Sequence, residues 1–245
     1  MVEIEHLYKI FDGNEVLHDI SCRFEPGKTN LIIGQSGSGK TVLMKCLIGL
    51  YEADKGSILY DNRDFSKMSK IERKIIRQEM GVMFQGGALF DSMTVEENVK
   101  FPLIMLSELS NKEKNERVDF CLERVQLGNS HKLFPSQLSG GMKKRVAIAR
   151  SIALNPKYLF CDEPNSGLDP KTSLVIDKLI SEITHEYQIT TIVNTHDMNS
   201  VMAIGETVSF IYEGNLWWSG SKEDVLQTDN EELNDFIRAT RYANK

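Results

Sequence analysis

The sequence lacks three features, and each absence excludes a kind of protein. No apolar run approaches the roughly 18–20 residues that a helix needs to cross a bilayer, so we expect no membrane-spanning segment. The net charge of −6, from 35 acidic and 29 basic residues, gives no reason to expect a nucleic-acid partner. The acidic, alternating start MVEIEHLYKIF does not resemble a signal peptide, which begins with positive charge.

Cysteine is scarce and unpaired in the sequence. The four cysteines, Cys22, Cys46, Cys121 and Cys161, form no C-x-x-C pair and show no metal-site spacing. Three of them lie in strongly apolar segments, which predicts buried, reduced thiols in a cytosolic setting. The remaining composition, 41% hydrophobic and 26% charged over 245 residues, is ordinary for a globular protein and fits one large domain or one domain with an inserted lobe.

Strands alternate with helices along most of the chain. Alternating or short apolar segments predict strands at 2–11, 15–24, 29–34, 57–61, 80–84, 158–162, 189–195 and 207–212. Helical patterns occupy 41–50, 69–79, 111–127 and 170–187, with further short helices towards the C-terminus. This alternation predicts a mainly parallel sheet.

The segment from about 88 to 155 has a different character. Thr94 with Glu97, and Ser110 with Glu113, have the spacing of capping boxes before helical runs. We therefore expect a mostly helical lobe over about 88–155, inserted into an α/β body formed by about 1–87 and 156–245.

A phosphate-binding loop follows the third predicted strand. GQSGSGKT, Gly34 to Thr41, matches G-x-x-x-x-G-K-[ST] and opens a predicted helix, which is the context that this motif requires. Gly37 and Gly39 permit backbone geometry that points N–H groups at phosphate oxygens. Lys40 adds positive charge near the β- and γ-phosphates, and the Thr41 hydroxyl is a ligand for Mg²⁺.

An acidic pair ends the apolar strand YLFCD. Asp162 at this strand tip can hold Mg²⁺ through its water shell, and Glu163 can deprotonate the water that attacks a γ-phosphate. A solvated acidic pair is the alternative, but the four apolar residues before it and the phosphate loop favour a site.

Three further side chains are candidates for this site. Gln85 and His196 follow predicted strands of the body, where α/β sheets place ligand sites. Gln85 could contact Mg²⁺ or the attacking water, and His196 could donate to the γ-phosphate. Phe11 could stack on adenine, although an aromatic residue in an N-terminal strand is also compatible with a core position.

The stretch LSGGMKKRVAIAR, Leu138 to Arg150, presents a second anion site. Ser139, Gly140 and Gly141 stand where a helix begins, and a helix start with free N–H groups binds anions. A chain that already has one phosphate loop has no obvious need for this second anion site.

The order of these motifs resembles the nucleotide-binding subunits of ABC transporters, over nearly the whole chain. The resemblance rests on the phosphate loop, Gln85, LSGGM, the acidic strand, SGLD at 166–169 and His196. It implies ATP and Mg²⁺ as cofactors, and an α/β P-loop (RecA-like) ATPase core with an antiparallel β subdomain and an inserted helical subdomain. It also implies a head-to-tail dimer of two copies, in which the Ser139–Gly141 segment of one copy closes over ATP held by the other.

The resemblance assigns roles to individual residues. Nucleotide binding falls to Phe11, to Ser36, Gly37, Ser38, Gly39, Lys40, Thr41 and Val42, and to Ser139, Gly140, Gly141 and Asp169, with Asp169 at the dimer seam. Catalysis falls to Lys40, Gln85, Glu163 and His196, and Mg²⁺ binding to Thr41, Gln85 and Asp162. Val42, Met142 and Asn165 depart from the residues common in the family, and none of these changes removes a catalytic group.

Within the family, GALFDSMTVEENV and LSGGMKKRVAIARSIAL resemble ATPases of Mla/Mce-type phospholipid transport systems. That resemblance implies a permease of the MlaE type, an Mce-domain lipid-binding subunit, and a peripheral position on the cytoplasmic face of the inner membrane. An ATPase subunit of an importer for amino acids or other small solutes is the alternative. A soluble ABC ATPase that acts on DNA or ribosomes is a third possibility, disfavoured because the chain has neither a long coiled coil nor a second cassette, and an intact Glu163 argues against a non-enzymatic binding module.

Overall fold

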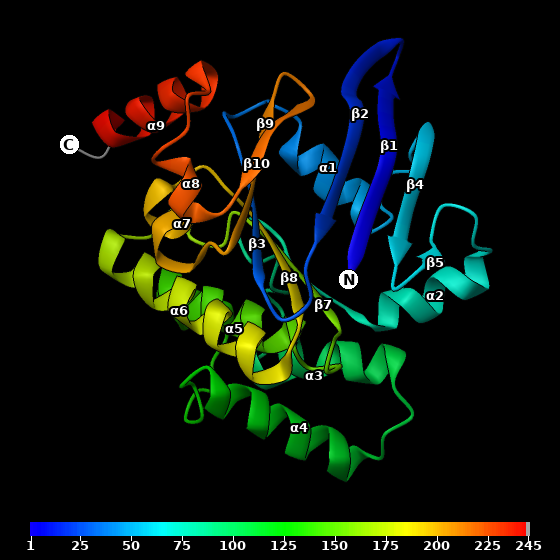
Figure 1. The fold of residues 1–245 in the computed structure, drawn as a ribbon. Helices are drawn as coiled ribbons and strands as arrows, with labels where there is room; N and C mark the ends of the chain where they lie inside the picture. Colours follow the sequence, from blue (N-terminus) through cyan, green and yellow to red (C-terminus); the bar gives the residue numbers. More distant parts are fainter. Residues whose placement is uncertain (244–245) are drawn as a thin grey trace.

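The computed structural model describes residues 1–243 (Figure 1), and it describes side chains over residues 1–240. Two sheets carry most of the strands, in the orders β2-β1-β4-β5 and β10-β9-β3-β8-β7-β6. The first sheet contains β1 (Val2–Phe11), β2 (Asn14–Phe24), β4 (Lys55–Tyr60) and β5 (Arg63–Asp64). The second contains β3 (Thr29–Ile33), β6 (Met80–Met83), β7 (Tyr158–Asp162), β8 (Thr190–Thr195), β9 (Thr207–Tyr212) and β10 (Asn215–Gly220).

The sheet pairings confirm the predicted fold class. All pairs in the four-stranded sheet are antiparallel, which matches the predicted antiparallel β subdomain. In the six-stranded sheet β9-β3, β3-β8, β8-β7 and β7-β6 are parallel. Only parallel strands place all their carboxyl ends at one edge, and that edge carries the site described below.

Strand β10 was not predicted. It forms an antiparallel hairpin with β9 through Glu213 and Gly214, which both have positive φ, 45° and 75°. Two such residues favour the tight turn that suits the twist of a hairpin. The sequence contained a signal for this hairpin, because the Glu-Gly pair stands between two segments that are rich in aromatic residues.

The helices begin and end close to the predicted positions. They are α1 (Lys40–Leu47), α2 (Lys70–Gln78), α3 (Val95–Leu106), α4 (Asn111–Arg124), α5 (Gly140–Ser151), α6 (Pro170–Tyr187), α7 (Met198–Ile204), α8 (Lys222–Val225) and α9 (Glu231–Ala243). The predicted capping boxes at the starts of α3 and α4 are both formed. The last two residues of the C-terminal segment predicted as helical, 244–245, lie outside the described residues.

Two apolar clusters cover the two faces of the six-stranded sheet. Along β7, Leu159 and Cys161 belong to one cluster and Phe160 to the other, as the alternation of a strand requires. The first cluster also contains Val99 of α3, Leu122 of α4 and other side chains of these helices. The helical segment therefore packs on the same core as the body, and its boundaries at 88 and 155 stay a prediction.

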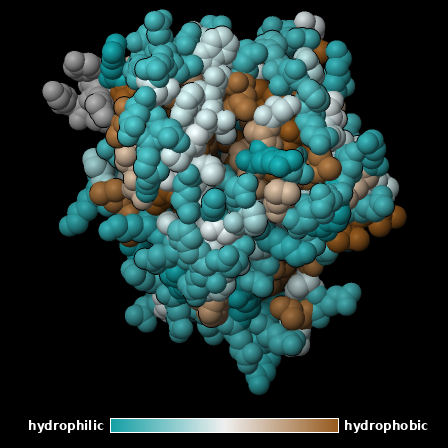
Figure 2. Space-filling view, viewed as in Figure 1, coloured by the Kyte–Doolittle hydropathy of each residue, from teal (hydrophilic) through white to brown (hydrophobic). Residues whose placement is uncertain are grey.

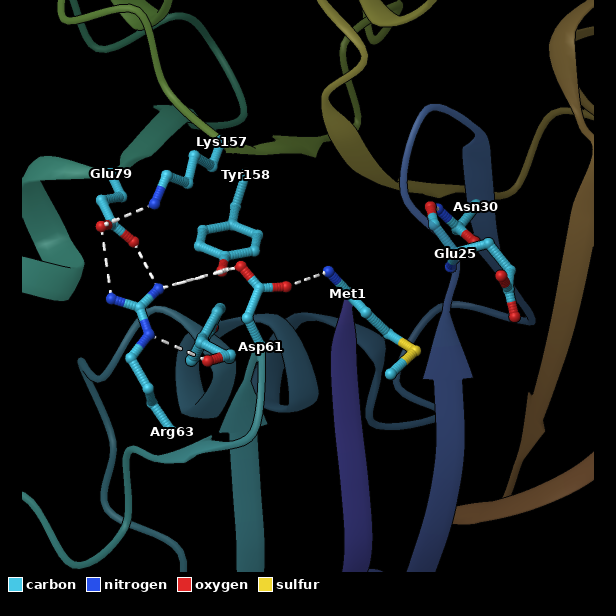
Figure 3. A network of polar contacts seen from close by, with 9 residues as sticks. Met1, Glu25, Asn30, Asp61, Arg63, Glu79, Lys157 and Tyr158 are labelled. Atoms are coloured by element: carbon cyan, nitrogen blue, oxygen red, sulfur yellow. Dashed lines mark hydrogen bonds and ion pairs between the residues drawn. The ribbon is translucent and has the colours of Figure 1, made fainter.

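A polar network ties the two sheets together at the amino end of β7 (Figure 3). The Tyr158 hydroxyl donates to Asp61 at 2.5 Å, and Asp61 also accepts from the Met1 ammonium at 2.5 Å. Arg63 bonds the Glu79 carboxylate through both terminal nitrogens, at 3.2 and 2.5 Å. These bonds lie at the opposite end of β7 from Asp162, so they hold the sheets without entering the site.

The thiols and the surface agree with the composition. Cys46, Cys121 and Cys161 are buried, Cys22 is half-buried, and all four are free. Burial raises the pKa of the Cys161 thiol to about 12. Most of the face shown in Figure 2 is hydrophilic. Within residues 1–243, none of the helices combines the length and the apolar character that a membrane crossing requires.

Candidate nucleotide site

Four neighbouring parallel strands deliver the predicted site residues to one edge of the sheet. Ile33, the last residue of β3, pairs with Thr195 at the end of β8, and Asp162 of β7 pairs with Asn194 of β8. The chain continues from these ends into the phosphate loop, His196 and Glu163, and from β6 to Gln85. Adjacent parallel strands therefore bring together residues that are up to about 160 positions apart.

These strand ends surround a cavity of about 600 Å³. Nine predicted residues line it: Ser36, Gly37, Gly39, Lys40, Thr41, Val42, Gln85, Glu163 and His196. Val16, Gln35, Phe236, Ala239 and Thr240 complete the lining. Ser38 and Asp162 lie just behind the wall, each only 8% exposed.

The phosphate loop has the backbone that its glycines predict. Gly34, Gly37 and Gly39 have φ values of +150°, +83° and +106°. A Cβ on Gly34 would stand 2.2 Å from the Ile211 carbonyl oxygen, so no other residue fits there. Gly39 is the N-cap of α1, and no side chain caps the N–H groups of the first turn. They are therefore available to an anion at the helix start.

Lys40 is folded back over the loop. Its ammonium donates to the carbonyl oxygens of Gly34 and Gln35, both at 2.8 Å. Burial lowers the pKa of Lys40, and the nearby carboxylates of Glu163 and Asp162 act in the opposite direction. The Ser38 hydroxyl oxygen, beside them, is buried with no hydrogen-bond partner among the described residues. A loop with unused donors and an ammonium fits the phosphates of a nucleotide.

Asp162 is held in place by a buried amide. The Asn194 side chain donates to the Asp162 carboxylate at 3.1 Å and to the Lys40 carbonyl oxygen at 3.1 Å. Asn194 is fully buried. The described residues contain no group of three or more His, Cys, Asp or Glu side chains that would hold a metal alone. The donors Thr41, Gln85 and Asp162 suit Mg²⁺, which is commonly held by few protein ligands together with phosphate oxygens and water.

Glu163 and His196 bond to each other directly. His196 Nδ1 lies 2.8 Å from the Glu163 carboxylate. Glu163 has a left-handed backbone, φ +47°, and its N–H donates to the Asn194 carbonyl oxygen at 3.0 Å. The Glu163 side chain is 15% exposed and the His196 ring is 62% exposed. The His196 ring is therefore the more exposed member of this pair.

The predicted second anion site, Ser139 to Gly141 at the start of α5, lies away from this cavity. Ser139 is the N-cap of α5, and its hydroxyl oxygen accepts from the Met142 N–H at 3.3 Å. Gly141 is closely packed, since a Cβ there would stand 2.7 Å from Thr172 Cγ2. Asp169 caps α6 by accepting from the backbone N–H groups of Lys171 and Thr172. Ser139, Gly140, Gly141 and Asp169 thus do not line the cavity of their own chain.

Phe11 is also outside the cavity. Its ring packs edge-on against Tyr51, with centroids 5.2 Å apart, and the Lys9 ammonium lies 4.9 Å from its centroid. The aromatic side chain on the cavity wall is instead Phe236 of α9. Sequence reasoning assigned no role to this helix, because only tertiary packing through Leu233, Phe236 and Ile237 brings it beside the phosphate loop.

A parallel sheet with a phosphate loop, a buried strand-end aspartate and a following glutamate defines the class of P-loop ATPases. The family described as ABC transporter matches residues 17–166. The chain belongs to this family and is an ATP-binding, ATP-hydrolysing subunit of an ABC transporter.

Similar proteins cover almost the whole chain. The probable ribonucleotide transport ATP-binding protein mkl of Mycobacterium leprae (strain TN) is 35% identical over 98% of this chain and 69% of its own length. The methionine import ATP-binding protein MetN of Clostridium tetani (strain Massachusetts / E88) is 38% identical over 97% of this chain and 74% of its own length.

Solved structures share the fold. The dimeric post-hydrolysis state of the ATP-binding cassette MJ0796, bound to ADP and Pi, has a TM-score of 0.82 and 30% identity, and covers 91% of this chain and 99% of that one. The cbiO1 protein of Clostridium perfringens, part of the ABC transporter complex cbiONQ, has a TM-score of 0.85 and 29% identity, and covers 100% and 98%.

Proposed function

We propose that the cavity binds ATP with its phosphates on the Gly34–Thr41 loop. The uncapped N–H groups of α1 and the Lys40 ammonium would bind the β- and γ-phosphate oxygens. Thr41, Gln85 and Asp162 would hold Mg²⁺, which neutralises charge on the phosphate oxygens when bound. Asn194 would keep the Asp162 carboxylate oriented.

Glu163 would take a proton from the attacking water. Its carboxylate lies on the cavity wall and bonds to His196 Nδ1. An ionised carboxylate only accepts hydrogen bonds, so Nδ1 carries the proton and donates. His196 Nε2 could then donate to the γ-phosphate only from an imidazolium ring, which refines the role proposed for this histidine.

We infer that a second copy of the chain completes the site. The observation that carries this inference is that Ser139, Gly140 and Gly141 do not line their own cavity although they form an open helix start. The similar cassette MJ0796 is dimeric in its post-hydrolysis state with ADP and Pi bound. In a head-to-tail pair, the N–H groups of α5 and the Ser139 hydroxyl of one copy would reach the γ-phosphate held by the other. Asp169 at the dimer seam belongs to the same proposal. Stacking of Phe11 on adenine is a separate proposal, and it requires the adenine to extend beyond the cavity to the Phe11 ring.

We propose further that the dimer works beneath an integral membrane permease, peripheral to the cytoplasmic face, and energises import of a small solute. The names of the relatives support a small solute, since they specify ribonucleotide transport and methionine import. Because the two names specify different solutes, they support small-solute transport as a class and do not point to one transported compound. Phospholipid transport with an MlaE-like permease and an Mce-domain subunit is the second candidate, supported by the GALFDSMTVEENV stretch.

Reconstitution distinguishes the two candidates. A candidate permease subunit would be co-expressed with this chain, purified with it and placed in proteoliposomes, with Lys40→Ala as the matched inactive control. A small-solute importer would show ATP-dependent uptake of methionine or a ribonucleotide. A phospholipid system would instead move labelled phospholipid and require an Mce-domain subunit. Recovery of the chain only with ribosomes or DNA would contradict a transport role.

A further inference from the structure

Behind the wall of the site lies a buried polar cluster that the proposed reaction does not use. The Asn165 amide donates to the Asp177 carboxylate at 2.6 Å and to the Ser200 hydroxyl oxygen at 3.1 Å. Asp177 and Ser200 are each only 1% exposed. A buried carboxylate is costly unless hydrogen bonds satisfy it, and no cation forms an ion pair with Asp177 among the described residues.

The cluster joins three elements of the site. Asn165 lies in the loop between Glu163 and Asp169, Asp177 lies two turns into α6, and Ser200 lies in α7, which begins just after His196. The loop itself is closed by short backbone bonds, from Ser166 N–H to the Glu163 carbonyl and from Leu168 N–H to the Asn165 carbonyl. Asn165 thus bonds this loop to one side chain of each helix, in addition to the Asp169 cap of α6.

The same loop has open space on its other side. A second cavity, of about 330 Å³, is lined by Glu163, Asn165, Ser166, Gly167 and Leu168 of the loop and by Thr195, His196 and Asp197 of the strand end opposite. Gly167 has φ +79°, and a Cβ there would meet nothing within 4 Å. Nothing packs against the loop at Gly167, whereas Leu168 packs on the core and the Asn165 amide bonds the loop to α6 and α7.

We propose that Asn165, Asp177 and Ser200 are positioning residues that fix the Glu163–Asp169 loop relative to His196. The inference rests on the proposed roles of Glu163 and His196. A loop held at Asn165 keeps the Glu163 carboxylate at its 2.8 Å contact with His196 and keeps Asp169 at the start of α6. Loss of the cluster would leave ATP binding on the phosphate loop intact and slow the chemical step, because a shift of about 1 Å in a reacting group can cost about 100-fold in rate.

The test compares substitutions that break or keep the bonds. Asp177→Leu keeps the branched shape of the side chain but removes the carboxylate acceptor, so Asn165 keeps only its bond to Ser200. We expect kcat to fall at least about tenfold with the Kd for ATP changed less than about twofold. Asp177→Asn keeps an acceptor for Asn165 and a partner for Ser200, so kcat should stay within about twofold of the wild-type value. Asn165→Ala and Ser200→Ala should also lower kcat. These two variants take the place of Asp177→Leu in the test if Asp177→Leu does not fold.

Thr184→Val is the matched control on the same helix. Thr184 is fully buried and bonds Thr191 at 2.7 Å, seven residues beyond Asp177 and away from the loop. It should lower the melting temperature without changing kcat. Equal kcat losses in Thr184→Val and Asp177→Leu would overturn the proposal, as would wild-type kcat in a folded Asp177→Leu protein.

A second readout separates this inference from the proposed catalytic roles. In a Glu163→Gln background, ATP should trap a dimer, and adding Asp177→Leu should weaken that dimer by displacing Asp169, as measured by light scattering. Wild-type turnover in Glu163→Gln would refute the role of Glu163, while the effect of Asp177→Leu on kcat would still be measurable. An unweakened dimer together with unchanged kcat would refute the positioning role alone.

Discussion

His196 Nδ1 lies 2.8 Å from the carboxylate of Glu163, so the predicted base for the attacking water and the predicted donor to the γ-phosphate are a hydrogen-bonded pair. They are 33 positions apart and follow neighbouring strands, β7 and β8. The pairing gives His196 a positioning role besides the proposed phosphate contact, because the ring fixes the direction of the carboxylate. It also fixes the proton of the ring on Nδ1 whenever Glu163 is ionised.

Glu163→Gln should separate the basicity of the residue 163 side chain from its position beside His196. The glutamine oxygen can still accept from His196 Nδ1, so the geometry persists while the proton acceptor is lost. We expect kcat to fall about 10²–10⁴-fold with ATP binding retained, measured by phosphate release and by equilibrium binding of a fluorescent ATP analogue. His196→Ala serves as the comparison, since it should lower kcat by releasing the carboxylate. Normal turnover by Glu163→Gln would remove this residue from the base role.

Lys40→Ala and Ser139→Arg should complement each other in mixtures. Each variant alone should be nearly inactive, because the first loses phosphate charge and the second fills the open start of α5. A mixed head-to-tail dimer has one site with wild-type Lys40 and wild-type Ser139. We therefore expect partial recovery of ATPase, up to about half of the activity per dimer if the two sites act independently. Absence of recovery in dimers proven to be mixed would count against a shared site.

Gly141→Ala should destabilise the folded chain through a clash within a single copy, independently of any dimer contact. The added Cβ would stand 2.7 Å from Thr172 Cγ2, and such overpacking costs about 1–3 kcal/mol. Thr172→Ser removes that methyl group but keeps a hydroxyl to donate to Asp169, as Thr172 does at 2.5 Å. The double variant should therefore regain the free energy of unfolding measured in urea. Gly140→Ala, whose Cβ would meet Leu168 at 3.4 Å, is the milder control. A double variant as unstable as Gly141→Ala would show that Thr172 is not the obstacle.

Asp177 should make stability depend on pH. Burial raises the pKa of its carboxyl from 3.8 to about 6, against hydrogen bonds from Asn165 and Ser200, and the charge of Asp197 raises it further. Between about pH 4 and pH 6 the native state therefore binds a proton that the unfolded chain has lost, and this contribution to stability disappears as the pH rises through 6.

Asp177→Asn removes that titration. Its free energy of unfolding, relative to wild type, should rise by up to about 3 kcal/mol between about pH 4 and pH 7. Urea denaturation at each pH measures the difference, and Thr184→Val, which adds or removes no titrating group, should show a constant offset. Parallel curves for wild type and Asp177→Asn would show that Asp177 keeps an ordinary pKa.

The local features of the site were predictable because short-range chemistry encodes them. Gly34, Gly37 and Gly39 occupy backbone conformations that other residues avoid, and Thr94 and Ser110 cap helices through bonds to residues three positions away. Strand ends followed by Glu163 and His196 also sufficed to place those residues at one edge of the sheet, since parallel strands share that edge.

What the sequence could not determine is which side chains meet once the elements pack. Helix α9 borders the cavity and Phe11 does not, because apolar burial of Leu233, Phe236 and Ile237 decides where that helix docks. The bonds of Glu163 with His196, of Asn194 with Asp162 and of Asn165 with Asp177 join residues from 12 to 33 positions apart. Sequence alone determined the phosphate loop, the placement of Glu163 and His196 at one sheet edge and the class of ATPase, because each depends on residues that are near neighbours or on a fixed order of strands. Only the tertiary structure decided the contacts that orient those groups, because they depend on the register and packing of separate elements.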